Sequence, residues 1–588
     1  MTAFSLTHPT AAVARGIEDI VIYGERSNLF VKGACGVGAR AVSVVVFPVF
    51  LTLELLFKRI PKMLLSIGTE KFDRKADKSL KFILSIIPSI ILGIHSPEGV
   101  PGFFVKRQRN DLEIRPFGVE KVFGLTLKEG ISYPMFAQDV QYIVQKAKKN
   151  KQQVAIIGAG LSQGKQTIPT AVDQCVINTK YLNHIKVEPE ENTVTVGAGA
   201  TWEEIQLALD EANKSAIVKQ ASDIFSIGGT IGMNAHGWAH QYGPISKTVR
   251  SLKVVDANGD LRVLSRPRDH VLNCELTDDE LLFKCMLGTL GYFGVVVEAT
   301  LDIVDNDVLI ESTQEIERDQ FVQEYEKIKS DPMIPLFGGR LVLDTLDGDP
   351  LRTICMVSYR RSEDQQGDLA KRKITEEPKW GTRIQRIGLK LISHLSYFSV
   401  KRLISHFWQQ EKAAMFSGRV VTRNEALHPP INAFKILHHS DLHAQWLQEY
   451  FVKPEQLPNF LRFLGAELKA NEVRMINATI RPTPKDDISV LPYAEQDRYA
   501  VVICFAQVKT EAEMAKTRKW IENVQEFLLS PGQEGVFYQA YMPYATQEQF
   551  IRCYGPERVA AMRALKRRFD PEDVFGNAHT AKYYKEVL

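Results

Sequence analysis

The chain has 588 residues, more than one domain usually holds and suited to two or three. Hydrophobic residues make up 45% and charged residues 24%, the balance of an ordinary globular protein, so global disorder is not expected. The net charge is only +3, from 73 basic and 70 acidic residues, which leaves no bulk electrostatic case for nucleic acid as a partner.

The seven cysteines are scattered along the chain and never form a C-x-x-C pair. This pattern indicates reduced thiols rather than a disulfide framework or a zinc site, and no metal site is expected. The start of the chain lacks a charged segment followed by an apolar run and a cleavage site, so no secretory signal is predicted. A cytoplasmic location is therefore expected.

Residues 1–117 form an apolar and basic N-terminal extension, expected to be helical. Two apolar runs, 41–57 and 82–94, flank a segment rich in Lys and Arg. A membrane-spanning helix needs about 20 apolar residues, and the first run is interrupted while the second is too short. Three interpretations stay open: a hairpin on a membrane surface over 41–94, a true span, or helices buried against the body or a partner. The first would place the protein peripherally on the cytoplasmic face of a membrane.

From about residue 118 helices and strands alternate. A strand over 154–157 leads directly into the glycine-rich sequence GAGLSQG at 158–164. The other expected elements are an amphipathic helix over 138–149, strands over 176–178 and 193–196, a helix over 201–212 capped by Thr201, a hairpin of 252–256 and 261–264, a helix over 278–286, and a strand that follows a glycine-rich turn and ends at 301.

The pattern from residue 304 to 541 is mixed α and β. Strands that line a pocket are expected over 448–451, 473–481 and 499–505. Residues 384–408 alternate apolar and basic side chains. This segment is interpreted either as an amphipathic segment on a membrane surface or as a helix packed inside the second domain.

The stretch 225–243, FSIGGTIGMNAHGWAHQYG, holds five glycines and no Asp, Glu, Lys or Arg. Glycine accepts φ > 0 and lets the backbone approach a ligand closely. A turn of this composition, with Thr230, Asn234 and His236 among the glycines, offers bare N–H groups and a few side-chain donors. It suits a large planar cofactor that bears phosphates; the alternative is a loop that only turns the chain.

The sequence VAIIGAG at 154–160 invites a dinucleotide-binding interpretation. That motif requires G-x-G-x-x-G, a helix directly after it and an acidic residue about 20 positions on. Here Gln163 stands at the third glycine position, Gly164 comes one residue late, and a poor helix sequence follows. The loop is therefore expected to bind phosphate through backbone N–H groups, outside a Rossmann frame.

Three glycine-rich segments follow one another: GAGLSQG at 158–164, SIGGTIGMNAHG at 226–237 and GTLGYFGVVVE at 288–298. Their order resembles the FAD-binding PCMH-type domain of the vanillyl-alcohol-oxidase and p-cresol-methylhydroxylase superfamily. The hairpin VVDANG and the ending DP…F-x-N resemble the same family. Within it the chain is most similar to the aldonolactone-oxidase and decaprenylphosphoryl-ribose-oxidase-like branch, on the segments 219–223, 424–426, 448–451, 477–481 and 541–544.

The resemblance implies an α+β fold with a two-subdomain FAD-binding domain at 118–305. An α+β cap domain that binds substrate would follow at 306–545, and residues 546–588 would return to the FAD domain. FAD is the implied cofactor. Many relatives attach it covalently through a histidine in the first glycine-rich loop. The matching position is Leu161, so the FAD is expected to be non-covalent.

The residues implied in cofactor binding lie in these segments. They are Gly158, Ala159, Gly160, Leu161, Ser162, Gln163 and Gly164 around the pyrophosphate, Ala221, Ser222, Gly228, Gly229 and Thr230 on the second side, Asn234, His236 and Gly237 near the flavin ring, and Val296 and Asn577.

His236 is the main catalytic candidate, expected to orient a substrate hydroxyl or to accept its proton. The alternative is a neutral histidine that only forms a hydrogen bond with the flavin. Arg481 and Lys485 are the catalytic candidates in the cap. Three further cap residues are candidates for binding a polar substrate: Arg340, Glu449 and Tyr541.

The resemblance implies oxidation of a C–OH group of a sugar, polyol, lactone or lipid-linked sugar, with hydride transfer to flavin N5. Two alternatives stay open: a flavin-dependent C=C reductase similar to sterol reductases, and a non-catalytic, membrane-associated module with a flavin fold. The lysine that decaprenylphosphoryl-ribose oxidases carry after the H-G pair is Trp238 here, and the H-W-G-K signature of aldonolactone oxidases is absent. The substrate of neither relative therefore carries over.

Overall fold

In a computed structural model of the chain, the structure describes residues 131–171, 173–267, 276–342, 349–364, 418–427 and 443–585. Their fold is α+β, and all of them belong to one compact unit. The expected extension over 1–117, with its apolar runs, and the basic segment 384–408 lie outside the described residues. Within the described ranges, no helix is long and apolar enough to cross a bilayer.

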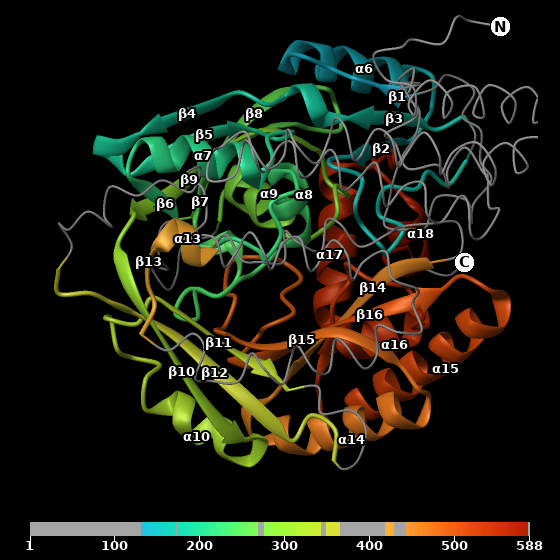
Figure 1. Cartoon of the computed structure of the whole chain (residues 1–588). Helices are drawn as coiled ribbons and strands as arrows, with labels where there is room; N and C mark the ends of the chain where they lie inside the picture. Colours follow the sequence, from blue (N-terminus) through green and yellow to red (C-terminus); the bar gives the residue numbers. More distant parts are fainter. Residues whose placement is uncertain are drawn as a thin grey trace, which may run out of the picture. The chain divides into compact units, whose positions relative to one another are not determined.

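The first of three sheets is parallel and small (Figure 1). Its strands, in spatial order, are β1 (Ile131–Ser132), β3 (Cys175–Asn178) and β2 (Val154–Ile157). Helix α6 (Ala137–Lys149) connects β1 to β2 and buries Val140, Val144 and Ala147. Because these residues are spaced by four and three positions, they form one apolar face of the helix.

The second sheet is antiparallel and built around its longest strand, β9 (Val295–Asp305), in which buried and partly exposed residues alternate. Three short helices pack close to it (Figure 1). The other strands are β4 (Ile185–Glu188), β5 (Thr193–Gly197), β7 (Val249–Val255) and β8 (Leu261–Ser265) in the order β4-β5-β9-β7-β8, with β6 (Lys214–Ala216) paired to β9; the helices are α7 (Trp202–Glu211), α8 (Ile227–Met233) and α9 (Asp278–Met286).

The third sheet is antiparallel, has eight strands and is called the large sheet below. Its order is β13-β10-β12-β11-β15-β16-β14-β17. The strands are β10 (Val308–Glu317), β11 (Leu336–Leu341), β12 (Thr353–Arg361), β13 (Val420–Thr422), β14 (His443–Val452), β15 (Arg474–Thr483), β16 (Arg498–Val508) and β17 (Val536–Phe537).

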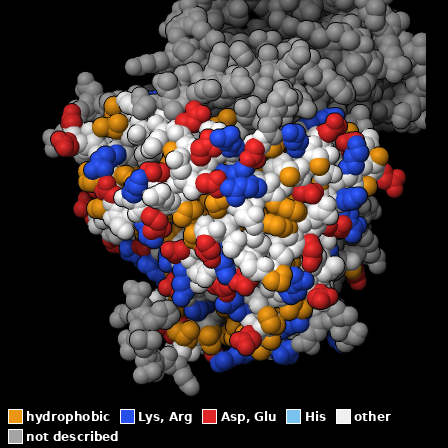
Figure 2. Space-filling model, turned by 90° about the horizontal axis from the view of Figure 1, so that it is seen from below, with side chains coloured by type: hydrophobic (Ala, Val, Ile, Leu, Met, Phe, Trp, Pro, Cys, Tyr) orange, Lys and Arg blue, Asp and Glu red, His pale blue; other side chains and the backbone are white. Residues whose placement is uncertain are grey.

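Helices cover one face of the large sheet. Phe460 of α14 (Leu457–Ala470) packs against Tyr450 with ring centroids 5.5 Å apart. Trp520 of α15 (Glu511–Leu528) packs edge-on against Phe505 at 5.2 Å. The side of the molecule on which α14 and α10 (Phe321–Glu326) lie carries interspersed acidic and basic side chains with small groups of hydrophobic ones (Figure 2). The opposite face of the large sheet is left for the site described below.

Most elements predicted from the sequence are present. Thr201 caps α7, accepting from the Glu204 amide at 3.3 Å. The predicted strand 154–157 is β2, the helix 278–286 is α9, the hairpin is β7 with β8, and the strands over 448–451, 473–481 and 499–505 are parts of β14, β15 and β16.

The interpretation of 225–243 as a turn needs one correction, because Ile227–Met233 form helix α8. Three of its seven residues are glycine, and glycine lowers helix stability. The helix forms nonetheless because Ile227, Thr230 and Ile231 are buried on one face. Tertiary packing outweighs the local propensity here.

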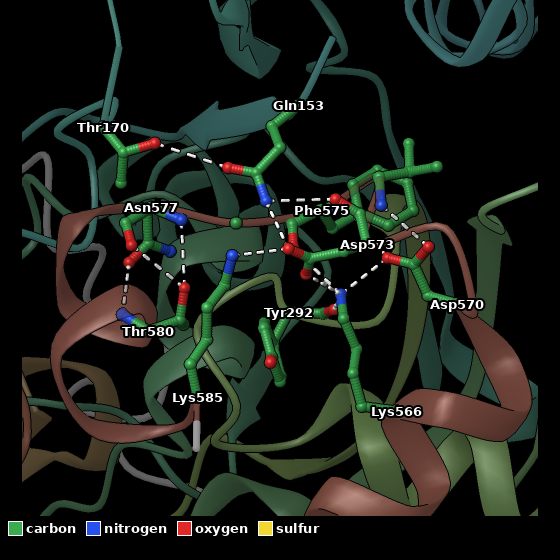
Figure 3. Close-up of polar contacts among 12 residues, drawn as sticks. Gln153, Thr170, Tyr292, Lys566, Asp570, Asp573, Phe575, Asn577, Thr580 and Lys585 are labelled. Carbon is green, nitrogen blue, oxygen red and sulfur yellow. Dashed lines mark hydrogen bonds and ion pairs between the residues drawn. The ribbon is translucent and has the colours of Figure 1, made fainter. Parts of the chain in front are cut away.

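The last part of the chain is held against β2 and the third glycine-rich segment. The Val154 amide donates to the Val574 carbonyl at 2.7 Å, and the Gly576 amide donates to the Val154 carbonyl at 3.1 Å. Helix α17 (Pro556–Phe569) supplies Lys566, whose Nζ lies at the centre of this region (Figure 3). The segment after α17 therefore extends the small sheet at its β2 edge.

Lys566 is a buried cation with several acceptors. Its Nζ donates to the carbonyls of Tyr292 at 2.7 Å and Phe575 at 2.8 Å, and to Asp570 Oδ2 at 2.6 Å (Figure 3). The Asp570 carboxylate also accepts from the Val574 amide at 2.8 Å. Burial lowers the pKa of Lys566, and the Asp570 charge opposes that shift. The ion pair and its carbonyl partners connect helix α17 to the segment that it positions.

We expect Lys566→Met to lower the free energy of unfolding by about 3–5 kcal/mol, because it leaves the Asp570 carboxylate buried without its cation. Urea denaturation measures the change. Arg568→Met on the same helix is the matched control, since Arg568 pairs with Asp278 at the surface and such pairs contribute little. Equal losses for the two variants would contradict the role given to Lys566.

Candidate functional site

The three glycine-rich segments, far apart in the sequence, lie together. The Ala159 amide donates to Ser226 Oγ at 3.1 Å, which joins the first segment to the start of the second. The Leu290 amide donates to the Gly232 carbonyl at 3.0 Å, which joins the third segment to the second. A Cβ placed on Gly158 would lie 3.6 Å from the Gly229 nitrogen, so the first loop directly abuts helix α8.

The first loop contains a run of consecutive amides without acceptors among the described residues. Gly160 has φ +71°, in the left-handed region that glycine favours. Among the residues that the structure describes, the N–H groups of Gly160, Leu161 and Ser162 have no acceptor, and Ser162 Oγ is buried without a partner. Successive unpaired amides in such a turn form an anion-binding nest. This geometry fits the pyrophosphate of a dinucleotide cofactor.

Gln163 and Gly164 join this loop to other parts of the fold. Gln163 Nε2 donates to the Gln445 carbonyl at 3.0 Å, and the Leu447 amide donates to Gln163 Oε1 at 3.0 Å. The Gly164 carbonyl accepts from His579 Nδ1 at 2.8 Å; burial lowers the pKa of His579 to about 4, so its ring is neutral. The contacts of both predicted residues are therefore with the protein, and their contact with a cofactor stays a prediction.

On the second side of the candidate site, Gly229 is exposed while Ala221 and Ser222 are partly exposed. A Cβ on Gly228 would lie 3.0 Å from the Ala198 carbonyl oxygen, so this glycine is required by packing. Thr230 Oγ1 accepts a hydrogen bond from the indole N–H of Trp202 and donates one to the carbonyl of Ser226, the N-cap residue of α8. Only some of the residues predicted here thus remain open to a ligand.

Three other predicted cofactor residues have structural contacts. Asn577 caps helix α18 (Ala578–Tyr583) and its Nδ2 donates to a carbonyl of the third glycine-rich segment at 3.1 Å. Asn234 Nδ2 donates to Asp486 Oδ2 at 2.7 Å. Gly237 packs directly on the backbone of the 219–223 segment.

Val296 lies on β9 opposite Val254 and is partly exposed. Its contact with a cofactor stays a prediction.

His236 and Glu449 form a buried acid–base pair. The exposed fraction is 4% for His236 and 3% for Glu449. His236 Nε2 forms a hydrogen bond with Glu449 Oε1, and Tyr541 OH lies 3.4 Å from the other carboxylate oxygen. His236 Nδ1 is buried with no partner in the described part of the chain. A buried ring atom without a partner indicates a position that a ligand would complete.

Glu449 projects from the face of the large sheet opposite to α14 and α15. In the strand register Glu449 pairs with Val502, Val502 with Thr479, and Thr479 with Arg340. Directly opposed residues project on the same face, so these side chains form one row. Arg481, two residues after Thr479, lies on the same face, and its buried Nε has no partner among the described residues. This face therefore presents polar groups toward His236.

Buried phenols surround the Glu449 carboxylate. Burial, and next the nearby Glu449 charge, raise the pKa of Tyr538 and Tyr541 well above the ordinary value, so both are neutral donors. Tyr538 OH donates to the Met233 carbonyl at 2.9 Å. Tyr493 OH donates to the Asn234 carbonyl at 2.6 Å. Sequence reasoning missed Tyr493 and Tyr538, because no spacing or motif signals their proximity to the glycine-rich segment.

Lys485 and Trp238 differ in position from His236. The Lys485 side chain is exposed, and no contact joins it to His236 or Glu449. Trp238 lies over the large sheet, and a Cβ on Gly338 would lie 2.9 Å from its ring. Of the three catalytic candidates, the structure brings His236 and Arg481 to the same region.

Comparison with known proteins identifies an FAD-binding domain within the chain. Residues 129–265 match a family model described as FAD binding domain. The chain is 29% identical to the FAD-linked oxidoreductase tazL of Aspergillus terreus, over 32% of this chain and 34% of that protein. It is 28% identical to a D-arabinono-1,4-lactone oxidase of Candida glabrata, over 31% and 33%. It is 23% identical to the FAD-dependent monooxygenase tpcD of Cochliobolus heterostrophus, over 75% and 81%.

The matched stretch spans about a third of the length of tazL and of the lactone oxidase. The class follows from this match and from the convergent glycine-rich segments: the chain contains an FAD-binding domain, and FAD is its cofactor. The match at residues 129–265 and the similarity to a D-arabinono-1,4-lactone oxidase support the family resemblance that the order of the segments predicts.

Gly158→Ala should raise the dissociation constant of FAD by about tenfold or more, because the added methyl group meets Ser226 Oγ and displaces the amide nest. Titration of apoprotein with FAD, followed by flavin fluorescence, measures the change. Gly232→Ala in helix α8 is the control: its Cβ would make an ordinary contact, 3.9 Å from Leu290 Cα. Equal affinities for the two variants would exclude the first loop as the pyrophosphate site.

Acid precipitation of the purified protein should release the flavin into the supernatant, because the position that the resemblance gives to a covalently bonding histidine is Leu161, whose side chain cannot bond to the flavin. The visible spectra of supernatant and pellet measure the partition. A pellet that stays yellow after washing would show a covalent bond at another residue.

Proposed function

We propose that this protein is an FAD-dependent oxidoreductase that oxidises a C–OH group of a sugar, polyol, lactone or lipid-linked sugar. The observation that carries the proposal is the buried His236–Glu449 pair, in which His236 Nδ1 has no partner among the residues that the structure describes. A reaction that removes a hydroxyl proton is accelerated by a positioned proton acceptor of this kind. The similarity to a lactone oxidase and to tazL, an FAD-linked oxidoreductase, supports an FAD-dependent oxidoreductase.

In this proposal the large sheet acts as the cap over the cofactor. The nest at Gly160–Ser162 holds the pyrophosphate, and bound FAD supplies the two-electron acceptor. Arg481 Nε, a buried donor, binds a substrate oxygen, while His236 Nδ1 receives the hydroxyl proton. The aromatic side chains around His236 exclude water from the reacting groups. Non-covalent binding of the FAD belongs to the same proposal.

The substrate class stays broad within the proposal. If the apolar runs at 41–94 bind a membrane surface, a lipid-linked sugar becomes the favoured member, and the protein works at the cytoplasmic face. Flotation of the full chain with anionic vesicles tests this part. Protein that stays at the bottom of the gradient contradicts membrane association without affecting the proposed reaction.

Anaerobic mixing with polyols, sugar lactones and prenyl-phospho sugars should bleach the flavin absorbance with at least one donor. His236→Gln should slow this reduction by about 10²-fold or more, because it removes the proton acceptor. Stopped-flow absorbance measures the rate. His184→Gln is a matched control, since His184 is a surface residue paired with Glu298.

Reduction by NADPH but by none of the donors would overturn the proposal in favour of a C=C reductase or a monooxygenase such as tpcD. A flavin that neither donors nor NADPH reduce would favour a non-catalytic module.

A further inference from the structure

The His236–Glu449 contact determines which ring nitrogen faces a ligand. An ionised carboxylate can only accept hydrogen bonds. With Glu449 ionised and the His236 ring neutral, the shared proton lies on Nε2, the atom that contacts Glu449 Oε1. Nδ1, buried and without a partner, is then left with its lone pair.

The ring has little freedom to exchange the two nitrogens. Phe451 contacts it edge-on at 5.5 Å between centroids, and Tyr493 lies at 5.9 Å. Phe451 and Tyr493 are themselves stacked at 4.1 Å. Since Phe451 lies two residues after Glu449, both project from the same face of β14. One strand thus supplies both the hydrogen-bond partner of the ring and its packing surface.

Among the described residues, no second cation lies within ion-pair distance of Glu449, although Arg481 lies close enough to act on the same phenols, Tyr538 and Tyr541. Among the described residues His236 is its only ion-pair partner, and its second oxygen faces the neutral Tyr541 hydroxyl at 3.4 Å. The carboxylate charge is therefore available to stabilise a positive charge on the ring. This arrangement suits a histidine that gains a proton during a reaction.

We propose that Glu449 is a positioning residue that holds the His236 proton on Nε2 and directs the Nδ1 lone pair at the substrate hydroxyl. This inference rests on the proposed function. In the step, the substrate O–H proton passes to Nδ1, and the O–H electron pair forms the second C–O bond of the carbonyl product. The C–H hydrogen leaves with its electron pair as hydride to FAD, which is the oxidant.

The tautomer of His236 can be measured in the resting protein, without substrate turnover. We expect magic-angle-spinning ¹⁵N spectra of the FAD-loaded, histidine-labelled protein at neutral pH to show His236 protonated on Nε2 and unprotonated on Nδ1. The difference spectrum against His236→Gln assigns the signals. A ring protonated on Nδ1, alone or together with Nε2, would overturn the proposal.

Glu449→Leu removes the acceptor. We expect mixed His236 tautomers, an FAD dissociation constant that changes little, and flavin reduction slower by about 10²-fold. Glu455→Leu is the control, because Glu455 is exposed in the segment that directly follows strand β14. Unchanged tautomer and unchanged rate in Glu449→Leu would overturn the role of Glu449. If Glu449→Leu fails to fold, the wild-type spectrum alone decides.

Failure of the proposed reaction can be distinguished from failure of the tautomer assignment, because the two are measured in separate experiments. If no C–OH compound reduces the wild-type flavin, the proposed reaction is wrong, whereas the tautomer assignment is measured on the oxidised protein without substrate. An Nε2-protonated ring in that case would support only the tautomer that Glu449 imposes on His236, and not the contact of Nδ1 with a substrate hydroxyl.

Discussion

The site depends on the way strand β14 is fixed to two of the glycine-rich segments. Near its start, the backbone at Gln445 and Leu447 exchanges two hydrogen bonds with the Gln163 side chain of the first loop. Two residues further on, Glu449 bonds His236 of the second segment. One strand of the large sheet therefore sets the distance between the anion-binding loop and the acid–base pair. A shift of this strand by one residue would turn Glu449 to the helix-covered face and separate the pair.

The opposite side of the first loop is fixed by the end of the chain. A neutral His579 donates to the Gly164 carbonyl, and the buried Lys566 connects helix α17 to the segment that pairs with β2. These contacts are between buried groups whose partners are mainly backbone atoms. Such groups are costly to leave unpaired, so they hold the loop in one conformation. The amides that would face a cofactor are thus held in place by contacts made elsewhere.

Local features of this fold could be predicted from the sequence, because they depend on residues that are close together in the chain. The strand at 154–157, the cap at Thr201 and the glycine-rich segments follow from periodicity, capping chemistry and composition. Helix α8 is an exception, because its glycines predict a turn. The burial of one of its faces, which stabilises the helix, depends on tertiary packing and is not visible in the sequence. The order of the segments predicts an FAD-binding domain, and the family match at residues 129–265 confirms it.

The relations between distant residues could not be predicted in the same way. His236 and Glu449 are 213 positions apart, and nothing in either neighbourhood encodes their contact. From the sequence, Lys485 is a catalytic candidate and Glu449 only one of several candidates for binding a polar substrate, whereas in the structure Lys485 lies exposed and Glu449 contacts His236. In the structure Asn577 caps helix α18, a role that could not be predicted from the motif in which it lies.

In the proposed holoenzyme the convergent glycine-rich segments and the facing sheet hold one FAD beside His236. A crystal structure of the FAD-loaded full chain tests this arrangement. We expect pyrophosphate density against the amides of Gly160–Ser162 and a flavin ring between the second segment and the His236–Glu449 pair. Density for FAD at another place, or a flavin ring out of reach of His236, would contradict it.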